Sequence, residues 1–244
     1  MHSFKVLLCL CLVIVAVYAD EHTKSESDLR KALFHHYDKL VRPVRSVSDV
    51  ITVETELAPV GIKDVDVKDK TIKIDTWLYV RWDDQYLTWD PVEYGGLDQL
   101  SLSAAEVWRP DLAVYSASTD TYFVPNVITN VVIFNNGTVI WVPPYTVKSR
   151  CIPSDNPITE EGAFQCTITL GSWTYDVARV IVKEKEQNIL EGMGKDSFHD
   201  THPKWTLESM VAHSEQKFYS CCPNAYSLVK FDLLFRKKQI AGDD

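Results

Sequence analysis

The hydrophobic pattern of the chain changes its period near residue 47. Before that point, over residues 25–41, apolar side chains recur at the spacing of one helix face: Leu29, Ala32, Leu33, Tyr37, Leu40 and Val41. This spacing predicts one amphipathic helix, which Ser25 or Ser27 can cap and which Pro43 ends. After residue 47, apolar and polar residues alternate with a period of two, which is typical of half-buried strands.

The alternation recurs in many short runs with turn-forming residues between them. The predicted strands cover residues 50–58, 70–83, 113–124, 127–134, 138–149, 164–170, 173–186, 205–219 and 226–238. The sequence Asn135-Asn136-Gly137 between two apolar runs indicates a hairpin, and the polar stretch 184–204 indicates a long surface loop. We therefore expect an all-β fold, an immunoglobulin-like β-sandwich of about ten strands with an N-terminal α-helix.

One predicted strand places aromatic residues on its polar face. In residues 71–82, one face carries a largely apolar set: Ile72, Ile74, Thr76, Leu78, Val80 and Trp82. Trp77 and Tyr79 fall on the opposite face, either as a harmless surface patch or as a contact surface, where Trp and Tyr are favoured. The run 138–142 is apolar on both faces, so we expect one of its faces to meet a neighbouring subunit.

The first nineteen residues have the pattern of a secretory signal. Lys5 precedes the apolar run 6–17, and Val17-Tyr18-Ala19 predicts cleavage before Asp20. The run is short for a membrane span, and no later stretch approaches 18 apolar residues. We expect residues 20–244 to form one secreted, extracellular domain without a membrane span, and an N-terminal anchor is the alternative.

Charge and cysteine content narrow the class of protein further. Without Lys5 the chain has 24 Lys and Arg against 34 Asp and Glu, a net charge of −10. This charge disfavours nucleic acid as a binding partner and favours the attraction of cations. The cysteines that remain after the signal are Cys151, Cys166, Cys221 and Cys222. Four cysteines allow three different sets of disulfide pairs. Export favours disulfide formation, and we expect the two local pairs, Cys151 with Cys166 and Cys221 with Cys222. A zinc site is the alternative, although the spacing fits no common zinc pattern.

Residues 218–226, Phe-Tyr-Ser-Cys-Cys-Pro-Asn-Ala-Tyr, form a distinctive segment that we call the flap. Neighbouring Cα atoms lie about 3.8 Å apart, below the usual disulfide span of roughly 4.4–6.8 Å. A bond between Cys221 and Cys222 would therefore make a stiff kink at a hairpin tip. Tyr219 and Tyr226 flank this kink, which suggests a rigid flap that closes over something small.

Taken together, three motifs resemble a known family. They are Trp-Arg-Pro-Asp followed by Tyr115, Gly-Ser-Trp-Thr-Tyr at 171–175, and the Tyr-x-Cys-Cys-x-x-x-Tyr of the flap. In this order they resemble the extracellular ligand-binding domain of nicotinic, Cys-loop type receptors, and most closely the soluble acetylcholine-binding proteins. The resemblance covers essentially the whole chain after the signal.

The resemblance implies a site between two subunits of a homopentamer that binds acetylcholine or nicotine-like cations. On its principal side it implies Tyr115, Trp173, Tyr219, Cys221, Cys222 and Tyr226. On its complementary side it implies Trp77, Val132, Ile140 and Val142. Aromatic faces attract organic ammonium groups by ~0.5–2 kcal/mol per ring. Trp108 and Trp82 are expected in the core, and a core position is the alternative for Trp173.

Two departures from channel subunits of that family point to a protein without a pore. The segment 152–165 is polar and lacks the Phe-Pro-Phe-Asp motif that meets the membrane domain in channels. The chain also stops at residues 242–244, where a channel would begin its first span. We therefore expect a soluble binding protein, and the extracellular domain of a channel subunit is the alternative.

Other functions find little support in the sequence. No glycine-rich phosphate loop or Gly-x-Ser-x-Gly elbow occurs, and His199 with His202 is a weak metal signal. We expect no enzyme, no cofactor and no metal; a choline-ester hydrolase and an adhesive sandwich remain alternatives. The sequon Asn136-Gly137-Thr138 makes Asn136 the expected position of any N-linked glycan.

Overall fold

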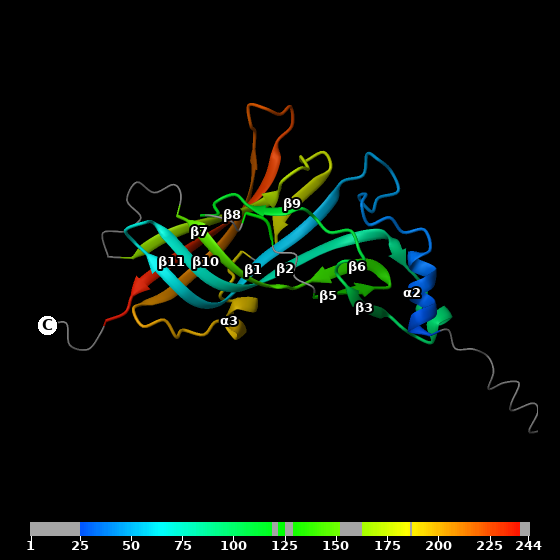
Figure 1. Cartoon of the computed structure of the whole chain (residues 1–244), viewed down its shortest axis with the longest axis horizontal. Helices are drawn as coiled ribbons and strands as arrows, with labels where there is room; N and C mark the ends of the chain where they lie inside the picture. Colours follow the sequence, from blue (N-terminus) through cyan, green and yellow to red (C-terminus); the bar gives the residue numbers. More distant parts are fainter. Residues whose placement is uncertain (1–24, 119–121, 125–128, 152–162, 186, 240–244) are drawn as a thin grey trace, which may run out of the picture.

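The protein consists mainly of two β-sheets and an N-terminal helix. Its computed structural model describes residues 25–118, 122–124, 129–151, 163–185 and 187–239. The expected signal 1–19 and most of the segment between Cys151 and Cys166 lie outside these residues. The helical elements are α2 (Glu26–Phe34), a 3-10 turn η1 (Pro91–Tyr94) and the short α3 (Met193–Ser197). Figure 1 shows α2 at one end of the molecule and the hairpin between β10 and β11 projecting from its body. Within the described part of the chain, no helix is long and apolar enough to cross a membrane.

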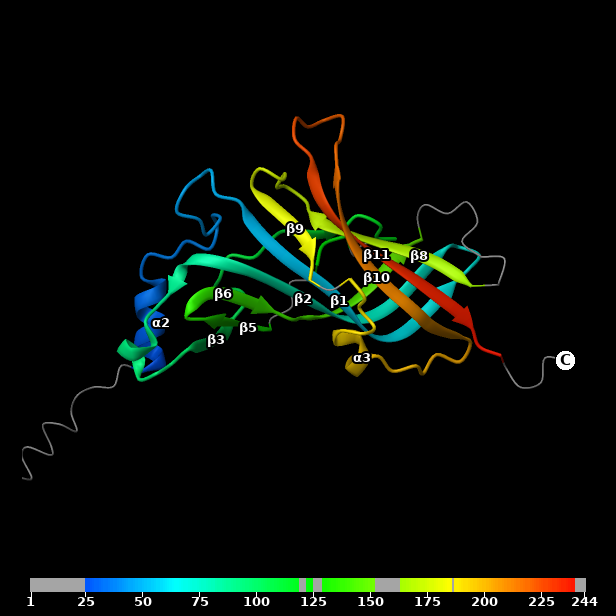
Figure 2. The ribbon, with the colours of Figure 1, turned by 180° about the vertical axis from the view of Figure 1, so that it is seen from behind.

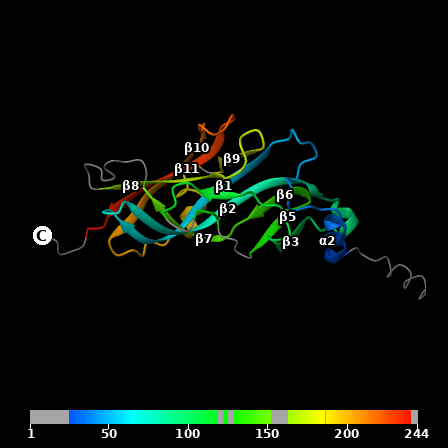
Figure 3. The same cartoon turned by 45° about the horizontal axis from the view of Figure 1, so that its top comes forward.

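The larger sheet has seven strands in the order β3-β5-β6-β2-β1-β9, and β7 also pairs with β2. Its strands are β1 (Ile51–Asp66), β2 (Thr71–Thr88), β3 (Gln99–Ser103), β5 (Asn130–Phe134), β6 (Asn136–Trp141), β7 (Pro144–Arg150) and β9 (Val180–Glu184). All its pairs are antiparallel except β1 with β9. The strands β3, β5 and β6 lie toward α2 (Figure 3).

The smaller sheet has four antiparallel strands in the order β10-β11-β8-β4. They are β4 (Leu112–Val114), β8 (Phe164–Ser172), β10 (Trp205–Lys217) and β11 (Tyr226–Lys237). Figures 1 and 2 show the molecule from opposite sides, with β8, β10 and β11 crossing β1 and β2. The expected all-β sandwich with an N-terminal helix is confirmed.

The core fills the space between the sheets with side chains that the alternating pattern places inward. Its largest members, Trp82, Phe164, Phe231 and Phe235, are each less than 2 % exposed. All six residues of the predicted inner face of β2 are buried, and Trp108 packs edge-on against Trp82 with ring centroids 6.1 Å apart. The core positions predicted for these two tryptophans are therefore confirmed.

One residue predicted on the polar face of β2 is buried instead. Tyr79 is only 8 % exposed, and the Nζ of Lys185 lies 4.6 Å from the centroid of its ring. Lys185 follows β9 and is also ion-paired with Glu56 of β1, which stands opposite Tyr79. The expected outward Trp–Tyr pair is thus wrong in its second member, which a distant lysine covers.

A disulfide joins the two sheets. It links Cys151, directly after β7, to Cys166 in β8, and the Cys151 amide donates a hydrogen bond to the carbonyl of Lys70. The second disulfide joins Cys221 to Cys222 in the flap. These are the two local pairs expected from the sequence.

The N-terminal helix is shorter than predicted. Ser25 caps it, with a reciprocal bond between Ser25 and Asp28, but it ends at Phe34 and not at residue 41. Bends follow at residues 35–36, and further along the Asp38 carboxylate accepts the amide of Leu40 at 2.9 Å in a local turn. Leu40 is 81 % exposed and Val41 is 55 % exposed, so their predicted places on the apolar stripe of a helix are wrong.

Several strand boundaries also differ from the prediction. The strand predicted over 113–124 is reduced to the short β4, since the chain turns at Tyr115 and Ser116; the strand over 173–186 starts only at Val180. The run 138–149 is two strands, β6 and β7. Gly61, a turn-forming residue between the predicted strands 50–58 and 70–83, lies inside β1, which continues through it with a shift of register. The loop 184–204 contains α3, whose Ser197 hydroxyl donates to the carbonyl of Pro59.

A buried polar network connects the segment after α2 to β2. The Tyr37 hydroxyl donates a 2.6 Å hydrogen bond to the Asp84 carboxylate and accepts one from the amide of Trp108 at 3.0 Å. Burial raises the pKa of the Asp84 carboxyl, although its hydrogen bonds lower it. Burial and the neighbouring Asp84 raise the pKa of Tyr37. Tyr37 therefore stays a neutral donor well above neutral pH.

Replacing Tyr37 by phenylalanine should lower the free energy of unfolding by about 1–2 kcal/mol, because a buried carboxylate and a buried amide lose a partner. Urea unfolding measures this loss. The control is Tyr86→Phe, since the exposed Tyr86 hydroxyl donates only to the carbonyl of Val44. Equal stabilities of the two variants would contradict a structural role for the Tyr37 network.

Candidate functional site

Four aromatic side chains predicted on the principal side lie together, and we call them the aromatic cluster: Tyr115, Trp173, Tyr219 and Tyr226. Tyr115 follows β4, Trp173 follows β8, and the two flap tyrosines stand at the ends of the β10–β11 hairpin. The ring centroids of Tyr115 and Trp173 are 5.8 Å apart, and those of Tyr219 and Tyr226 are 5.7 Å apart. Trp173 is 52 % exposed, so the alternative that it is a core residue is wrong.

The Trp173 loop is held by one carboxylate. Asp111 accepts hydrogen bonds from the Ser172 hydroxyl at 2.6 Å, from the Thr174 amide at 2.8 Å and from the Thr174 hydroxyl at 2.5 Å. Its carbonyl also accepts the amide of Trp173 at 3.1 Å. Asp111 thus fixes the residues on both sides of Trp173 and presents the indole toward solvent.

Tyr115 is held against the same loop. Its hydroxyl donates to the Ser172 carbonyl at 2.7 Å, and its amide donates to the carbonyl of Thr169. Gly171 allows this packing, because a Cβ there would lie 2.6 Å from a Leu228 methyl group and 3.5 Å from the Tyr115 ring. Burial raises the pKa of Tyr115, and Tyr219, Tyr226 and Asp111 raise it further, so the hydroxyl remains a neutral hydrogen-bond donor.

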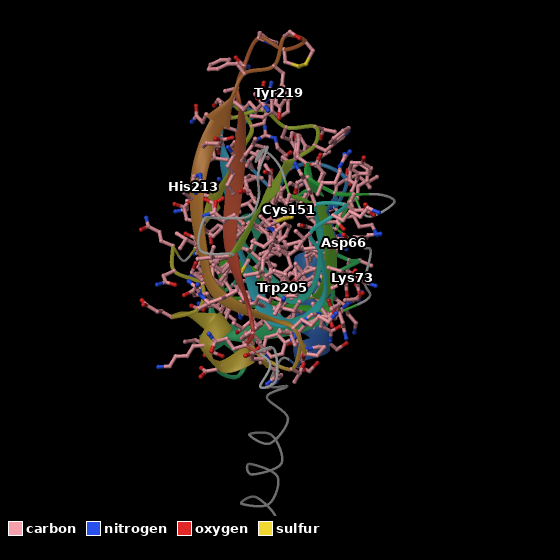
Figure 4. The ribbon with its side chains drawn as sticks, turned by 90° about the vertical axis from the view of Figure 1, so that its left-hand side faces the viewer. Asp66, Lys73, Cys151, Trp205, His213 and Tyr219 are labelled. Atoms are coloured by element: carbon pink, nitrogen blue, oxygen red, sulfur yellow. A yellow bond between two sulfur atoms is a disulfide. The ribbon has the colours of Figure 1, made fainter. Side chains whose placement is uncertain are left out.

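The flap projects beyond the sandwich but is tied to it at its base. Lys217 and Tyr226 pair across the hairpin, and the Asn224 amide donates to the Asp176 carboxylate at 2.7 Å. The Cys222 amide donates to the carbonyl of Tyr219 at 3.1 Å. Figure 4 shows the sulfur atoms at the tip of the flap and Tyr219 below them. Tyr219 of the flap and Tyr115 line the same groove, so the flap brings its tyrosine rings to the rest of the aromatic cluster.

The residues predicted on the complementary side lie on the other sheet, and we call them the outer-face group: Trp77, Val132, Ile140 and Val142. Ile140 stands opposite Val132 on one side and Arg81 of β2 on the other, and directly opposed residues share a face. Trp77 shares that face because it lies four residues from Arg81 along β2. Trp77 is 43 % exposed and Val142 is 37 % exposed.

The two groups therefore belong to different surfaces of one chain. The aromatic cluster is built on the four-stranded sheet, whereas the outer-face group lies on the side of the seven-stranded sheet that faces away from the core. A site that uses both groups needs the aromatic cluster of one chain and the outer-face group of another. Their separation within one chain is the geometry that an interfacial site requires.

The sequence did not single out Phe123, which the structure places next to the aromatic cluster. Its exposed ring meets Trp173 edge-on, with centroids 5.6 Å apart, and its backbone forms an isolated bridge with Ala113. The sequence predicts one continuous strand over 113–124, and this prediction gives no reason to place Phe123, near its end, beside Trp173. Phe123 adds a fifth ring beside the exposed indole.

Two minor predictions concern a metal and a glycan. In the described ranges, no group of three or more His, Cys, Asp or Glu side chains is placed to hold a metal ion. The Nδ1 of His202 instead accepts the amides of Lys204 and Trp205. Asn136 is exposed, and its side-chain oxygen accepts the amide of Thr138 at 3.0 Å. A glycan at Asn136 remains a prediction.

Comparison with known proteins finds a matching family model and several relatives. The family model for the neurotransmitter-gated ion-channel ligand binding domain matches residues 26–239. The acetylcholine receptor subunit alpha-type acr-16 of Caenorhabditis elegans is 32% identical over 237 residues, covering 96% of this chain and 46% of that protein. The neuronal acetylcholine receptor subunit alpha-2 of Rattus norvegicus is 32% identical over 232 residues, covering 95% and 44%.

A third relative, the acetylcholine receptor subunit alpha-like 2 of Drosophila melanogaster, is 27% identical over 246 residues, covering 95% of this chain and 41% of that protein. The chain thus spans somewhat less than half the length of the curated relatives that it matches. The match nevertheless covers the whole sandwich and the elements that carry both groups of candidate residues. The chain therefore belongs to the family of neurotransmitter-gated ion-channel ligand-binding domains, of the nicotinic, Cys-loop type.

Proposed function

We propose that the protein reversibly binds small organic cations, acetylcholine or nicotine-like amines, without chemical change. The ligand lies between the aromatic cluster of one subunit and the outer-face group of the next. Relatives of the chain are acetylcholine receptor subunits, which supports this class of ligand. A Trp173 ring that stays half exposed in the single chain, surrounded by the rings of Tyr115 and Phe123, is the observation that carries the proposal.

The chemistry of the aromatic cluster suits a cation that has few hydrogen-bond donors. An ammonium group over an aromatic face gains ~0.5–2 kcal/mol per ring, and several rings together offset the loss of its water. The neutral hydroxyls of Tyr115 and Tyr219 orient neighbouring groups, since burial raises both pKa values. The flap then closes over the ligand, with Cys221 and Cys222 at its tip, and slows its escape.

The complementary wall is apolar where the principal wall is aromatic. Trp77 and Val142 are large exposed hydrophobic residues on one sheet face, a combination favoured at contact surfaces. A heterologous contact between unlike surfaces that closes on itself generates a ring. We propose a ring of five identical subunits, with a site at each contact.

We further propose that residues 1–19 are a cleaved signal and that residues 20–244 act as a secreted, soluble binding protein. The polar segment 152–165 favours this form, because it lacks the apolar motif that contacts a membrane domain in channel subunits. The second candidate is the extracellular domain of a channel subunit, which the names of the relatives favour. Sequencing of the natural transcript beyond residue 244 distinguishes the two.

The direct test is binding of a labelled nicotinic ligand to the purified protein, with the mass determined by light scattering in the same sample. We expect saturable binding that a choline ester displaces, with no hydrolysis of the ester and a mass of five subunits. A stable monomer that binds no cation at micromolar concentration would overturn the proposal.

Trp173→Phe should weaken binding of a quaternary amine by about 1 kcal/mol or more, roughly fivefold, because tryptophan attracts cations best. An uncharged ligand of the same shape should lose less. Calorimetric titration of both ligands measures the difference. Tyr226→Phe is the matched variant, since it keeps the ring and removes only a hydroxyl. Equal losses for both ligands in a folded Trp173→Phe variant would show that Trp173 only shapes the pocket.

A further inference from the structure

A groove of about 600 Å³ runs along the outer face of the four-stranded sheet, beneath the flap. Tyr115 and Tyr219 of the aromatic cluster form one part of its wall. The remainder is polar and charged: Ser116, Thr167, Thr169, His213, Glu215, Lys217, Lys230 and Asp232, with Leu228. Figure 4 shows His213 below Tyr219 on the side of the molecule that carries β10. The groove therefore extends the aromatic cluster toward a region rich in charge.

Most charges in the groove are already paired across the hairpin. The Nζ of Lys230 lies 2.8 Å from the Glu215 carboxylate. The Asp232 carboxylate lies 3.3 Å from the Nδ1 of His213 and accepts a 2.6 Å hydrogen bond from the Thr167 hydroxyl. These pairs lie on neighbouring strands and hold one another in place. Glu215 and Lys230 cancel one another's charge, and Asp232 lies six residues along β11 from Tyr226, away from the flap end of the groove.

Lys217 is the exception at the end of the groove nearest the flap. Its exposed Nζ lies 5.2 Å from the centroid of the Tyr219 ring, and no ion pair joins it to a carboxylate of the described residues. As the last residue of β10, it stands opposite Tyr226 in the hairpin. One ammonium group without an ion pair to the described carboxylates therefore stands at the flap end of the groove, beside Tyr219.

A fixed ammonium at this position acts oppositely on two parts of a ligand. It repels a cationic nitrogen bound against Trp173, and it attracts a carboxylate that extends from the same ligand into the groove. Charges separated by less than a Debye length, about 8 Å at physiological salt, are only partly screened. In a ligand that carries both charges, the attraction between its carboxylate and Lys217 offsets part of the repulsion between its nitrogen and Lys217.

From this geometry we propose that Lys217 makes the site select amphoteric ligands. These are organic ammonium compounds that also carry a carboxylate or a comparable anionic group, which pairs with the Lys217 ammonium. The proposal rests on the proposed function, because the cationic end of the ligand occupies the aromatic cluster. It adds a specificity-determining residue and a ligand class to that site.

The test compares acetylcholine with O-acetylcarnitine, which carries the same acetyl and trimethylammonium groups and one additional carboxymethyl group. Both are titrated into the wild-type ring and into Lys217→Met, which keeps most of the aliphatic stem and removes the charge. We expect Lys217→Met to bind acetylcholine about threefold more tightly and O-acetylcarnitine about threefold more weakly. Lys217→Arg, which keeps the charge, should retain the wild-type preference.

The control is Lys68→Met, which makes the same change of net charge at an exposed lysine in the turn between β1 and β2. It should leave both affinities unchanged. Shifts of both ligands in the same direction, or no shift, in a Lys217→Met variant that still binds acetylcholine would overturn the role of Lys217 alone. Absence of acetylcholine binding to the wild-type ring would overturn the proposed function and this inference together.

Discussion

Replacing Asp111 by alanine should weaken binding of a quaternary amine by more than tenfold, which corresponds to about 1.4 kcal/mol or more. The same variant should lose about 2–4 kcal/mol of the free energy of unfolding. The Asp111 carboxylate accepts three hydrogen bonds, from the Ser172 hydroxyl and from the amide and hydroxyl of Thr174. Hydrogen bonds to charged groups contribute roughly 1.5–3 kcal/mol each, and partial exposure of Thr174 reduces that sum.

The effect on binding is indirect, because Asp111 holds Trp173 without itself facing a ligand. Without the carboxylate, the residues on either side of Trp173 lose their anchor and the indole samples other orientations. Asp111→Asn should be less harmful, since its Oδ1 can still accept from Thr174 and only the bond from the Ser172 hydroxyl loses its acceptor. Titration calorimetry and urea unfolding measure the two losses.

A matched control for Asp111→Ala is Asp98→Ala, which removes an exposed carboxylate between η1 and β3. It should change neither affinity nor stability by a measurable amount. If Asp111→Ala binds like the wild type, the orientation of Trp173 must come from other contacts, such as its packing against Tyr115 and Phe123.

Strands that bury one face in the core and expose the other are predicted well from the sequence. Alternation identified the buried face of β2, because the pleat sends successive side chains to opposite sides. It failed at Tyr115 and Ser116, where the chain leaves β4. The buried Ser116 hydroxyl accepts both the Ser149 hydroxyl and the Thr169 amide, so contacts with β7 and β8 fix this turn. The alternation of apolar and polar residues within a short segment does not predict contacts with distant strands.

Turn-forming residues misled the prediction for a related reason. Gly61 indicates a turn between the predicted strands 50–58 and 70–83, yet β1 runs through it in a long hairpin with β2. The pairing on both sides tolerates a shift of register at this residue, and tertiary contacts therefore override the local preference. The first helix shows the reverse case: it ends at Phe34, although the apolar stripe would continue to Val41, and a turn at Asp38 follows.

The candidate site divides in the same way. Motifs locate Tyr115, Trp173 and the flap tyrosines, because closely spaced sequence signals carry them. Contacts between distant segments escaped prediction: Lys185 over Tyr79, and Phe123 against Trp173. A residue on the outer face of a strand meets either solvent or a side chain from a segment that packs over that strand. Hydrophobic periodicity does not predict which segment packs there.

The outer-face group can be tested by placing a charge at its centre. Val142 follows β6 on the face that carries Trp77 and Ile140, and its side chain is 37 % exposed in the single chain. An aspartate there stays hydrated in a free subunit, so the sandwich should fold normally. In a ring, the same carboxylate would be buried against the apolar wall of the site without a partner, which costs several kcal/mol at each contact.

Val142→Asp should therefore dissociate the proposed ring into folded monomers and reduce cation binding by more than a hundredfold, since the aromatic cluster would lose its opposing wall. Light scattering and ligand titration on one sample measure both effects. Val92→Asp makes the same chemical change at a residue of η1 that is 85 % exposed and should leave the ring intact. A Val142→Asp protein that remains a ring and binds the cation would show that this face lies outside the contact, whereas monomers that bind with unchanged affinity would place the whole site within one chain.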